Sequence, residues 1–215
     1  MHQKPDGDAM GSTLGLYHFL NKSGHTCTVI SPTNWASFLN WMPDCKKVID
    51  YEAQPAKADE LIADADWIFC LDFNILSRTK RMEEKLKSAK GERILIDHHQ
   101  EPDTAMFAYG ISDVNKSSTA EMVYDFIVES GNAGKIDATI GECLYAGVMT
   151  DTGSFHHNTS ARVFKIVAIM KEAGLDDTRI QELVLNSQPD KYLKLLGHCL
   201  HNRMELVPEL KFGLI

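Results

Sequence analysis

The chain alternates between short apolar runs and longer segments in which apolar residues recur at helical spacing. In the first half, apolar runs typical of strands occupy residues 26–31, 66–73, 93–97 and 106–112. Amphipathic segments with an apolar residue every three or four positions lie at 7–24, 56–65 and 76–90. Strands that alternate with helices favour a parallel sheet with helices on both faces. We therefore predict an α/β fold, with a doubly wound, mostly parallel sheet and flanking helices.

The second half of the chain has a different pattern, because almost all of it has helical periodicity. We predict helices within 117–131, 136–151, 160–174, 177–187 and 190–206, and a final strand within 208–215. Ser118 or Thr119 is a suitable N-cap for the first of these helices, with Glu121 in its first turn. The pattern predicts one domain over 1–187, a linker helix over 188–207 and the start of another unit over 208–215.

Composition excludes several classes of protein. The 215 residues are 44% hydrophobic and 24% charged, which is ordinary for one globular domain and a fragment of another. No run of about 18 apolar residues is present and the N-terminus is polar, so we expect neither a membrane span nor a signal peptide. A net charge of −8 argues against a protein that coats long duplex nucleic acid. Five scattered cysteines without a CxxC pair predict structural thiols in a reducing cytoplasm.

Four separate segments place acidic residues and histidines where a predicted strand or helix begins or ends. They offer His2, Asp6 and Asp8 before the first helix, Asp72 after one strand, Asp97, His98 and His99 after the next, and Asp151 at the end of an apolar helix. Each segment alone has an ordinary explanation as a turn, a helix cap or a surface polar group. In an open parallel sheet, however, ligands bind at the carboxyl ends of the strands, so we expect the four segments to converge there.

Carboxylates that converge in a dry crevice either hold protons or require a cation. Oxygen and imidazole ligands without thiolates favour Mn²⁺ or Mg²⁺, and to a lesser degree Zn²⁺ or Co²⁺. The number of candidate ligands exceeds what one ion needs. We therefore expect two ions about 3.5–4 Å apart, an arrangement that hydrolyses phosphate esters.

The four segments resemble the signature motifs of a known family. The stretches "HQKPDGDAMGS", "LDFN", "IDHH" and "GVMTDTGSF" look like the four motifs of the RecJ-like DHH phosphoesterase family. Their spacing and the continuation "PDGDAMGS…LGLYHFL" most resemble the bacterial oligoribonuclease/pAp-phosphatase branch. The resemblance implies that 1–187 is a DHH domain without its first strand, which would precede His2. It also implies that 208–215 is the truncated start of a C-terminal substrate-binding domain.

The resemblance further implies a role for each motif residue. Six residues would hold two manganese ions: His2 and Asp6 the first, Asp8, His98 and Asp151 the second, and Asp72 both. His99 would be a catalytic residue that contacts the substrate phosphate instead of a metal. Asp97 would orient the histidines, a usual role for a carboxylate beside an imidazole ligand.

The function implied by the resemblance is hydrolysis of short oligonucleotides, pAp (adenosine 3′,5′-bisphosphate) or related small phosphoesters. A hydroxide activated by the two metal ions would attack phosphorus. Three alternatives stay open: an exopolyphosphatase or inorganic pyrophosphatase, a cyclic-dinucleotide phosphodiesterase, and a metal-binding regulatory module without turnover.

Two loops have both a functional and a structural interpretation. His156, with His157 and Asn158, either lines the substrate pocket or belongs to a capped loop before the helix at 160–174. Residues 117–119 either offer hydroxyls and a helix N-terminus to an anion or form a simple helix cap.

An aromatic cluster and a histidine pair leave similar alternatives. Trp35, Phe38 and Trp41 either stack on bases or pack against the sheet or against a partner subunit in a homodimer. His198 and His201 fit a solvated or interface face of the last helix.

Overall fold

Five short parallel strands form the centre of the protein. The computed structural model describes residues 1–215, and its strands in this region are β1 (Ile30–Ser31), β2 (Ile49–Asp50), β3 (Trp67–Leu71), β4 (Glu92–Asp97) and β5 (Tyr109–Ser112). They form a two-stranded sheet, β1–β2, and a three-stranded sheet in the order β3–β4–β5. All pairings among them are parallel. β1 is shorter than the predicted 26–31, and β2 has too few residues to give a sequence signal.

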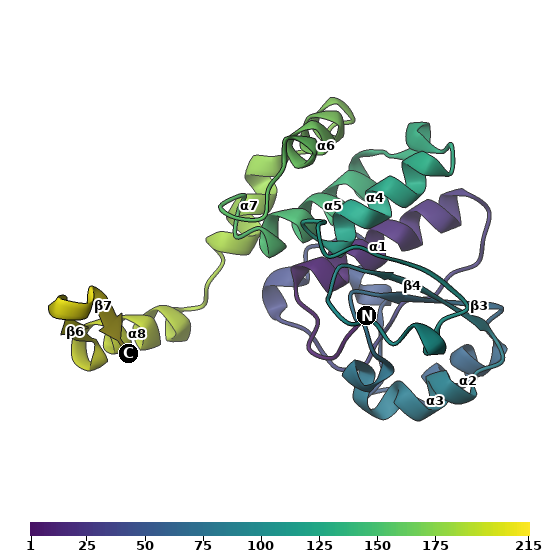
Figure 1. The fold of residues 1–215 in the computed structure, drawn as a ribbon, viewed down its shortest axis with the longest axis horizontal. Helices are drawn as coiled ribbons and strands as arrows, with labels where there is room; N and C mark the ends of the chain where they lie inside the picture. Colours follow the sequence, from purple (N-terminus) through teal and green to yellow (C-terminus); the bar gives the residue numbers. More distant parts are fainter.

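Helices cover both faces of the three-stranded sheet, and the predicted α/β class is confirmed. The helices are α1 (Gly7–Lys22), α2 (Pro55–Asp64), α3 (Glu83–Ser88), α4 (Thr119–Glu129), α5 (Ala138–Asp151), α6 (Ala161–Glu172), α7 (Asp177–Leu185) and α8 (Asp190–His198). In Figure 1, α1, α4 and α5 lie on one side of β3 and β4, while α2 and α3 lie on the other. Single 3₁₀ turns occupy Ser37–Leu39, Cys45–Lys47, Thr104–Met106 and Ala133–Lys135.

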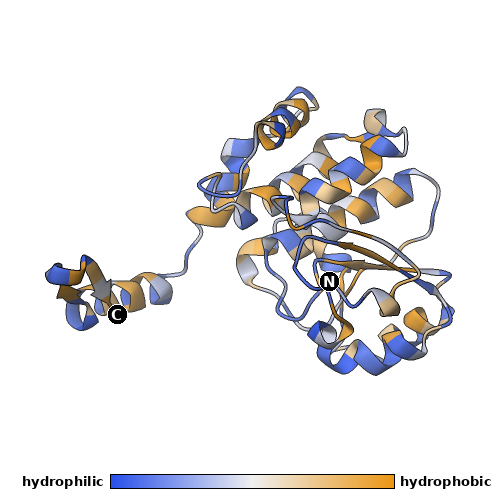
Figure 2. Cartoon of the chain, in the orientation of Figure 1, coloured by the Kyte–Doolittle hydropathy of each residue, from blue (hydrophilic) through white to orange (hydrophobic).

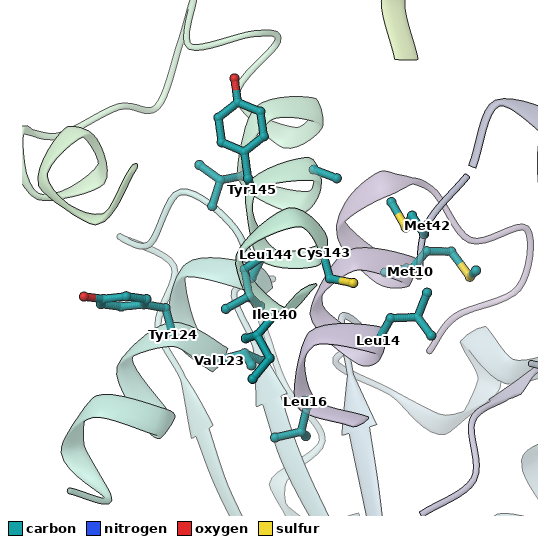
Figure 3. Packing of buried hydrophobic residues seen from close by; sticks show 14 of the residues in the cluster. Met10, Leu14, Leu16, Met42, Val123, Tyr124, Ile140, Cys143, Leu144 and Tyr145 are labelled. Atoms are coloured by element: carbon teal, nitrogen blue, oxygen red, sulfur yellow. The ribbon is translucent and has the colours of Figure 1, made fainter. Parts of the chain in front are cut away.

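Each face of the sheet has its own hydrophobic core. The larger core contains 32 buried residues, among them Leu14 and Leu16 of α1, Val123 of α4 and Leu144 of α5. Figure 3 shows Val123, Ile140 and Leu144 together near α4 and α5, while Leu14 lies with Met10 and Met42 on the other side of α1. The smaller core contains nine buried residues and joins α2 and α3 to the other face of β3. The hydrophobic effect across both faces fixes the strand ends that carry the polar motifs.

The helix predicted over 76–90 is interrupted. A 3₁₀ segment, Leu76–Met82, precedes α3, and Lys80 has φ 52° and ψ −113°. The Arg78 carbonyl accepts a hydrogen bond from the Gln3 backbone N–H (2.9 Å) instead of continuing an α-helical ladder. The N-terminal segment therefore holds this turn in a conformation that helical periodicity alone does not predict.

The last residues form a separate element group. The helix α8 continues into a π-helical turn (Cys199–Arg203), then an antiparallel hairpin of β6 (Glu205–Val207) and β7 (Phe212–Leu214), with a 3₁₀ turn at Pro208–Leu210 between them. Figure 1 shows this group away from the body, and no residue in 190–215 is buried. Figure 2 colours parts of this group as hydrophobic. The exposed apolar side chains there include Leu195, Leu206 and Leu214. The three-part division predicted above stays a prediction.

No helix in the structure combines the length and the apolar character that a bilayer crossing requires.

Candidate metal centre

The first group of predicted ligands joins the N-terminal segment to the end of β3. His2 Nε2 lies 3.4 Å from Asp72 Oδ2 and 3.7 Å from Asp6 Oδ2. The three ligand atoms of His2, Asp6 and Asp72 lie within 4.8 Å of one another. Asp6 is the N-cap of α1, and its Oδ1 accepts hydrogen bonds from the backbone N–H groups of Asp8 and Ala9, both at 3.0 Å. Its other oxygen is the one that faces His2.

The second group joins α1, the end of β4 and the end of α5. His98 Nε2 lies 3.4 Å from Asp151 Oδ2 and 3.9 Å from Asp8 Oδ2. The ligand atoms of Asp8, His98 and Asp151 also lie within 4.8 Å of one another. Three elements distant in sequence therefore present one imidazole and two carboxylates to a common point.

Asp72 faces both groups. Its Oδ2 is the oxygen nearest His2, and its Oδ1 lies 3.7 Å from His98 Nε2. The side chain is buried, and its backbone has φ 63°, a left-handed conformation that is uncommon for a residue other than glycine. The chain thus turns sharply after β3 at the residue whose two oxygens are shared.

The N-terminus of α4 donates hydrogen bonds to the carboxylates of Asp8 and Asp72. The backbone N–H groups of Thr119 and Ala120 donate to Asp8 Oδ2 (2.7 Å) and Oδ1 (2.9 Å), and Thr119 Oγ1 donates to Asp72 Oδ1 (3.0 Å). Ser118 is the N-cap and accepts from the Glu121 backbone N–H. The cap interpretation of residues 117–119 therefore holds, and the N-terminus of α4 also donates to Asp8. A role of these residues in binding a substrate anion stays a prediction. Sequence reasoning missed these donors to Asp8 because backbone N–H groups leave no residue-type signal.

Asp97 and His99 form a tight pair beside the two groups. Asp97 is buried; its Oδ1 lies 2.7 Å from His99 Nδ1, and its Oδ2 accepts from the His99 backbone N–H at 3.1 Å. This pairing occupies Nδ1 of His99 and leaves Nε2 available. His99 Nδ1 also lies 3.8 Å from Asp72 Oδ1, so Asp72, His98 and His99 form a third group with metal-ligand spacing. The hydrogen bonds connect Asp97 to His99 and not to His98.

The electrostatics of the cluster indicate an excess of negative charge. Burial raises the pKa of Asp8 well above its usual range, and the charges of Asp72 and Asp151 raise it further. The pKa of Asp151 is also raised, chiefly by burial. Burial opposes the charged form of His2, yet hydrogen bonds to Asp6 and Asp72 raise its pKa to about 9. Without a cation, burial and mutual repulsion therefore favour the protonated forms of Asp8 and Asp151.

Hydrogen bonds also shift the pKa values of His99 and Asp6. The hydrogen bond to Asp97 raises the pKa of His99, against the effect of partial burial. Burial would raise the pKa of Asp6, but its hydrogen bond with His2 keeps that pKa below its usual value.

The donor set fits hard or borderline divalent cations. All three groups consist of carboxylate oxygens and imidazole nitrogens, and none contains a cysteine. Such ligands suit Mn²⁺, Mg²⁺ and related ions better than soft metals. The five cysteines are free thiols, and burial raises the pKa of Cys70 to about 12, which keeps it protonated.

The comparison with known families agrees with this geometry. The model of the DHH family, N-terminal domain, matches residues 1–148. The chain belongs to the DHH family. Its resemblance to the oligoribonuclease/pAp-phosphatase branch is confirmed by a relative that is 30% identical over 203 residues, the bifunctional oligoribonuclease and PAP phosphatase NrnA of Thermus thermophilus. That alignment covers 93% of this chain and 56% of the relative.

Other relatives of this DHH protein extend the comparison. The cyclic-di-AMP phosphodiesterase GdpP of Geobacillus thermodenitrificans is 26% identical over 194 residues, which cover 86% of this chain and 29% of the relative. The crystal structure of an exopolyphosphatase-related protein from Bacteroides fragilis superposes with a TM-score of 0.94 at 38% identity, covering 97% of this chain and 61% of that one. The DHH chain thus spans between 29% and 61% of the length of these three relatives.

Several candidates lie outside the cluster of this DHH domain. His156, His157 and Asn158 are exposed, and none of their side chains forms a hydrogen bond or ion pair with the cluster. The backbone N–H groups of both histidines instead donate to the Thr152 carbonyl, at 2.9 and 3.1 Å. These contacts describe a turn after α5, and a role in substrate binding stays a prediction.

The aromatic cluster has a packing role in the structure. Trp35, Phe38 and Trp41 are partly buried against the larger hydrophobic core. The Trp35 indole donates to Asn40 Oδ1 at 3.0 Å, and the Arg179 guanidinium lies over the Trp41 ring. His198 and His201 are exposed on the C-terminal group.

Proposed function

We propose that this DHH protein is a phosphoesterase that hydrolyses short oligonucleotides and pAp-like small phosphoesters at two divalent cations. The observation that carries the proposal is the position of Asp72. One of its oxygens lies 3.4 Å from His2 and the other 3.7 Å from His98, which belong to different ligand groups. A carboxylate shared in this way is the expected bridge of a two-metal site.

His2, Asp6 and Asp72 would hold one cation, and Asp8, His98, Asp151 and Asp72 the other. Bound there, the cations would act as Lewis acids and lower the pKa of a water molecule toward neutrality. Mn²⁺ is the expected ion because the ligands mix carboxylates with imidazoles, and Mg²⁺, Co²⁺ or Zn²⁺ are the alternatives.

The residues around the cations have separate tasks. Asp97 fixes the His99 ring through Nδ1, so that Nε2 can donate to a phosphate oxygen as negative charge develops on it. Thr119 and Ala120 hold Asp8 in place, so that it need not reorganise when a cation binds. We expect these contacts to orient the phosphate and stabilise its transition state.

The relatives support the substrate class. One is named for oligoribonuclease and PAP phosphatase activity, and another for cyclic-di-AMP phosphodiesterase activity. The substrates share a phosphoester joined to a nucleoside, so this feature defines the class proposed for this chain. The similarity to GdpP makes cyclic-dinucleotide hydrolysis the second candidate.

A substrate panel tests the proposal. The purified chain is stripped of metal, reloaded with Mn²⁺, and incubated separately with pAp, a dinucleotide, cyclic di-AMP and pyrophosphate. Released phosphate and nucleotide are quantified by colorimetry and chromatography. We expect turnover of pAp and the dinucleotide that requires added metal. Full metal occupancy without turnover of any substrate would favour a regulatory module instead.

A matched pair of variants controls for loss of folding. Asp151→Asn alters the last residue of α5, which belongs to the second ligand group, and Asp64→Asn alters the last residue of α2, which is exposed and outside the cluster. Asp151→Asn should lower metal content and activity, and Asp64→Asn should change neither. Equal activity of the two variants would remove Asp151 from the proposed site.

A further inference from the structure

A polar cavity adjoins the first ligand group. It has a volume of about 240 Å³, and the residues that line it are His2, Gln3, Ser77, Arg78 and Lys80, none of them hydrophobic. His2 is shared between this cavity and the group that contains Asp6 and Asp72. The cavity therefore opens beside the proposed reaction centre, and it is smaller than the roughly 300–1,000 Å³ of sites for whole organic ligands.

The two cationic side chains that line this cavity, Arg78 and Lys80, have no acidic partner in the protein. Neither Arg78 nor Lys80 forms an ion pair, and neither side chain donates a hydrogen bond, although Lys85 and Lys87 farther along the same segment are paired with acids. Arg78 is only partly exposed, so its guanidinium has lost some solvation without gaining a carboxylate. Unpaired cations that line a polar cavity are typical of a site for an anionic group.

Backbone contacts fasten the turn that carries Arg78 and Lys80 to the N-terminal segment. The Gln3 backbone N–H donates to the Arg78 carbonyl at 2.9 Å, which fastens the turn to the residue that follows His2. Lys80 has φ 52°, in a region that residues other than glycine rarely adopt. Arg78 is also near enough to His99 for its charge to oppose the rise in the His99 pKa. The cavity thus adjoins the first ligand group through His2, and the charge of Arg78 acts on the His99 ring.

We propose that this cavity binds a second, non-scissile phosphate of the substrate, with Arg78 as its main donor and Lys80 as a supporting charge. The inference rests on the function proposed above and refines it, because it selects substrates that carry two phosphate groups. In pAp, the 3′-phosphate would be hydrolysed at the ligand groups while the 5′-phosphate occupies the cavity. Water would add to the 3′-phosphorus, and the 3′-oxygen would leave with a proton to give AMP and phosphate.

The kinetic test compares two substrates with the same scissile bond. Adenosine 3′-monophosphate keeps the 3′-phosphate of pAp and lacks the 5′-phosphate. In the metal-loaded full chain, Arg78→Gln should raise KM for pAp at least tenfold, with little change in kcat, and change kcat/KM for 3′-AMP less than twofold. Arg81→Gln removes an exposed charge that does not line the cavity and should match the unaltered protein on both substrates. An equal loss on both substrates would overturn the proposal.

A binding measurement decides the question without turnover. AMP carries only the non-scissile phosphate, and adenosine carries none. By isothermal titration calorimetry, the unaltered chain should bind AMP more tightly than adenosine, and both Arg78→Gln and Lys80→Gln should reduce that preference, Arg78→Gln by tenfold or more. Undiminished AMP binding by Arg78→Gln would refute the cavity assignment even where pAp is hydrolysed. A chain that keeps the AMP preference but hydrolyses neither substrate would refute the proposed function alone.

Discussion

Asp72 combines three properties that rarely occur together in one residue. It is buried, its backbone is in the left-handed region, and each of its oxygens faces a different histidine. A buried carboxylate is costly unless cations or hydrogen bonds compensate it. Here Thr119 Oγ1 donates to one oxygen of Asp72, and His2 Nε2 lies 3.4 Å from the other. The residue is therefore the one whose loss should affect both ligand groups at once.

Asp72→Asn should lower metal content and activity together. The amide keeps the shape of the side chain but removes the negative charge, so both cations lose a ligand and kcat should fall by at least about a thousandfold. Metal content is measured by mass spectrometry after dialysis, and activity by hydrolysis of pAp. Asp66→Asn, at the exposed opposite end of the same strand region, is the matched control and should retain both. Retention of both metals by Asp72→Asn would refute the bridging role.

His99→Gln should separate turnover from metal binding. Nδ1 is the His99 atom nearest Asp72, and Asp97 already occupies it, so we expect the ring to act on phosphate through Nε2 and not to bind a cation there. Removal of one such donor typically costs about 10²–10³ in kcat. The variant should therefore keep its metal and lose activity on that scale, measured in the same two assays. Loss of a metal ion from His99→Gln would make it a ligand and reverse the division of roles between His98 and His99.

The side chains of the candidate centre could be predicted from sequence, while their supporting contacts could not. Strand ends in a parallel sheet meet at one edge, so Asp72 and the segment 97–99 were expected near each other, and the structure places His98 Nε2 3.7 Å from Asp72 Oδ1. The donors Thr119 N and Ala120 N belong to the backbone of a helix 111 and 112 residues from Asp8. The cavity cations Arg78 and Lys80 were hidden because their segment has the periodicity of a helix that the structure interrupts.

At the scale of helices and strands, the close packing of α1 against α5 depends on Gly11. A Cβ added to Gly11 would lie 2.4 Å from the Cys143 carbonyl oxygen and 2.9 Å from the Gly147 nitrogen, both backbone atoms of α5. Neither atom can move without displacing the helix. Because α1 carries Asp8 and α5 ends at Asp151, this close contact brings the two carboxylates of the second ligand group together.

Gly11→Ala should destabilise the fold and disturb the second ligand group. Overpacking of this kind costs about 1–3 kcal/mol. Urea unfolding should show that loss, and Mn²⁺ affinity should weaken because α1 is pushed away from α5. Gly141→Ala is the matched control on α5, since its Cβ would meet only Met170 at 3.7 Å, and a helical alanine is favoured by about 0.5–1 kcal/mol over glycine. Equal stability of the two variants would show that the helices separate without cost.

Helical and strand periodicity predicted the elements well where a segment packs into a core and less well where it does not. The helices α1, α4 and α5, which all contribute to the larger core, match their predicted ranges to within a few residues. The segment predicted as one helix over 190–206 instead ends α8 at His198, continues as a π turn and then enters β6. No core fixes this part, because none of its residues is buried.

At the scale of the whole molecule, the body and the C-terminal group should be energetically separable. Removal of residues 188–215 takes away no buried side chain, so the melting temperature of the remaining chain should change by less than about 2 °C. Differential scanning calorimetry of the two chains measures this. A fall of more than about 5 °C would show that the C-terminal group stabilises the body and would contradict the predicted domain over 1–187.

Metal ions and protons should compete for the same ligand atoms, and this competition should set how the stability of the whole protein depends on pH. Asp8 has a raised pKa in the folded state, so above the ordinary carboxyl range the folded chain keeps a proton that the unfolded chain has lost. Stability of the metal-free protein therefore falls as pH rises through that folded pKa, and His2, with its pKa raised to about 9, acts in the same direction at higher pH. Mn²⁺ requires deprotonated ligands, so its stabilising effect should grow over the same interval.

Thermal unfolding with and without Mn²⁺, at several values from about pH 5 to pH 7.5, checks this competition. The rise in melting temperature caused by Mn²⁺ should increase steadily with pH, and at about 100 times Kd the ion should add about 2.7 kcal/mol per site. In Asp8→Asn the amide does not ionise in this pH range. The rise in melting temperature caused by Mn²⁺ should therefore be smaller and should depend less steeply on pH. A rise that is independent of pH in the unaltered protein would mean that protons do not occupy the cluster, and the excess of negative charge inferred from its burial would then be wrong.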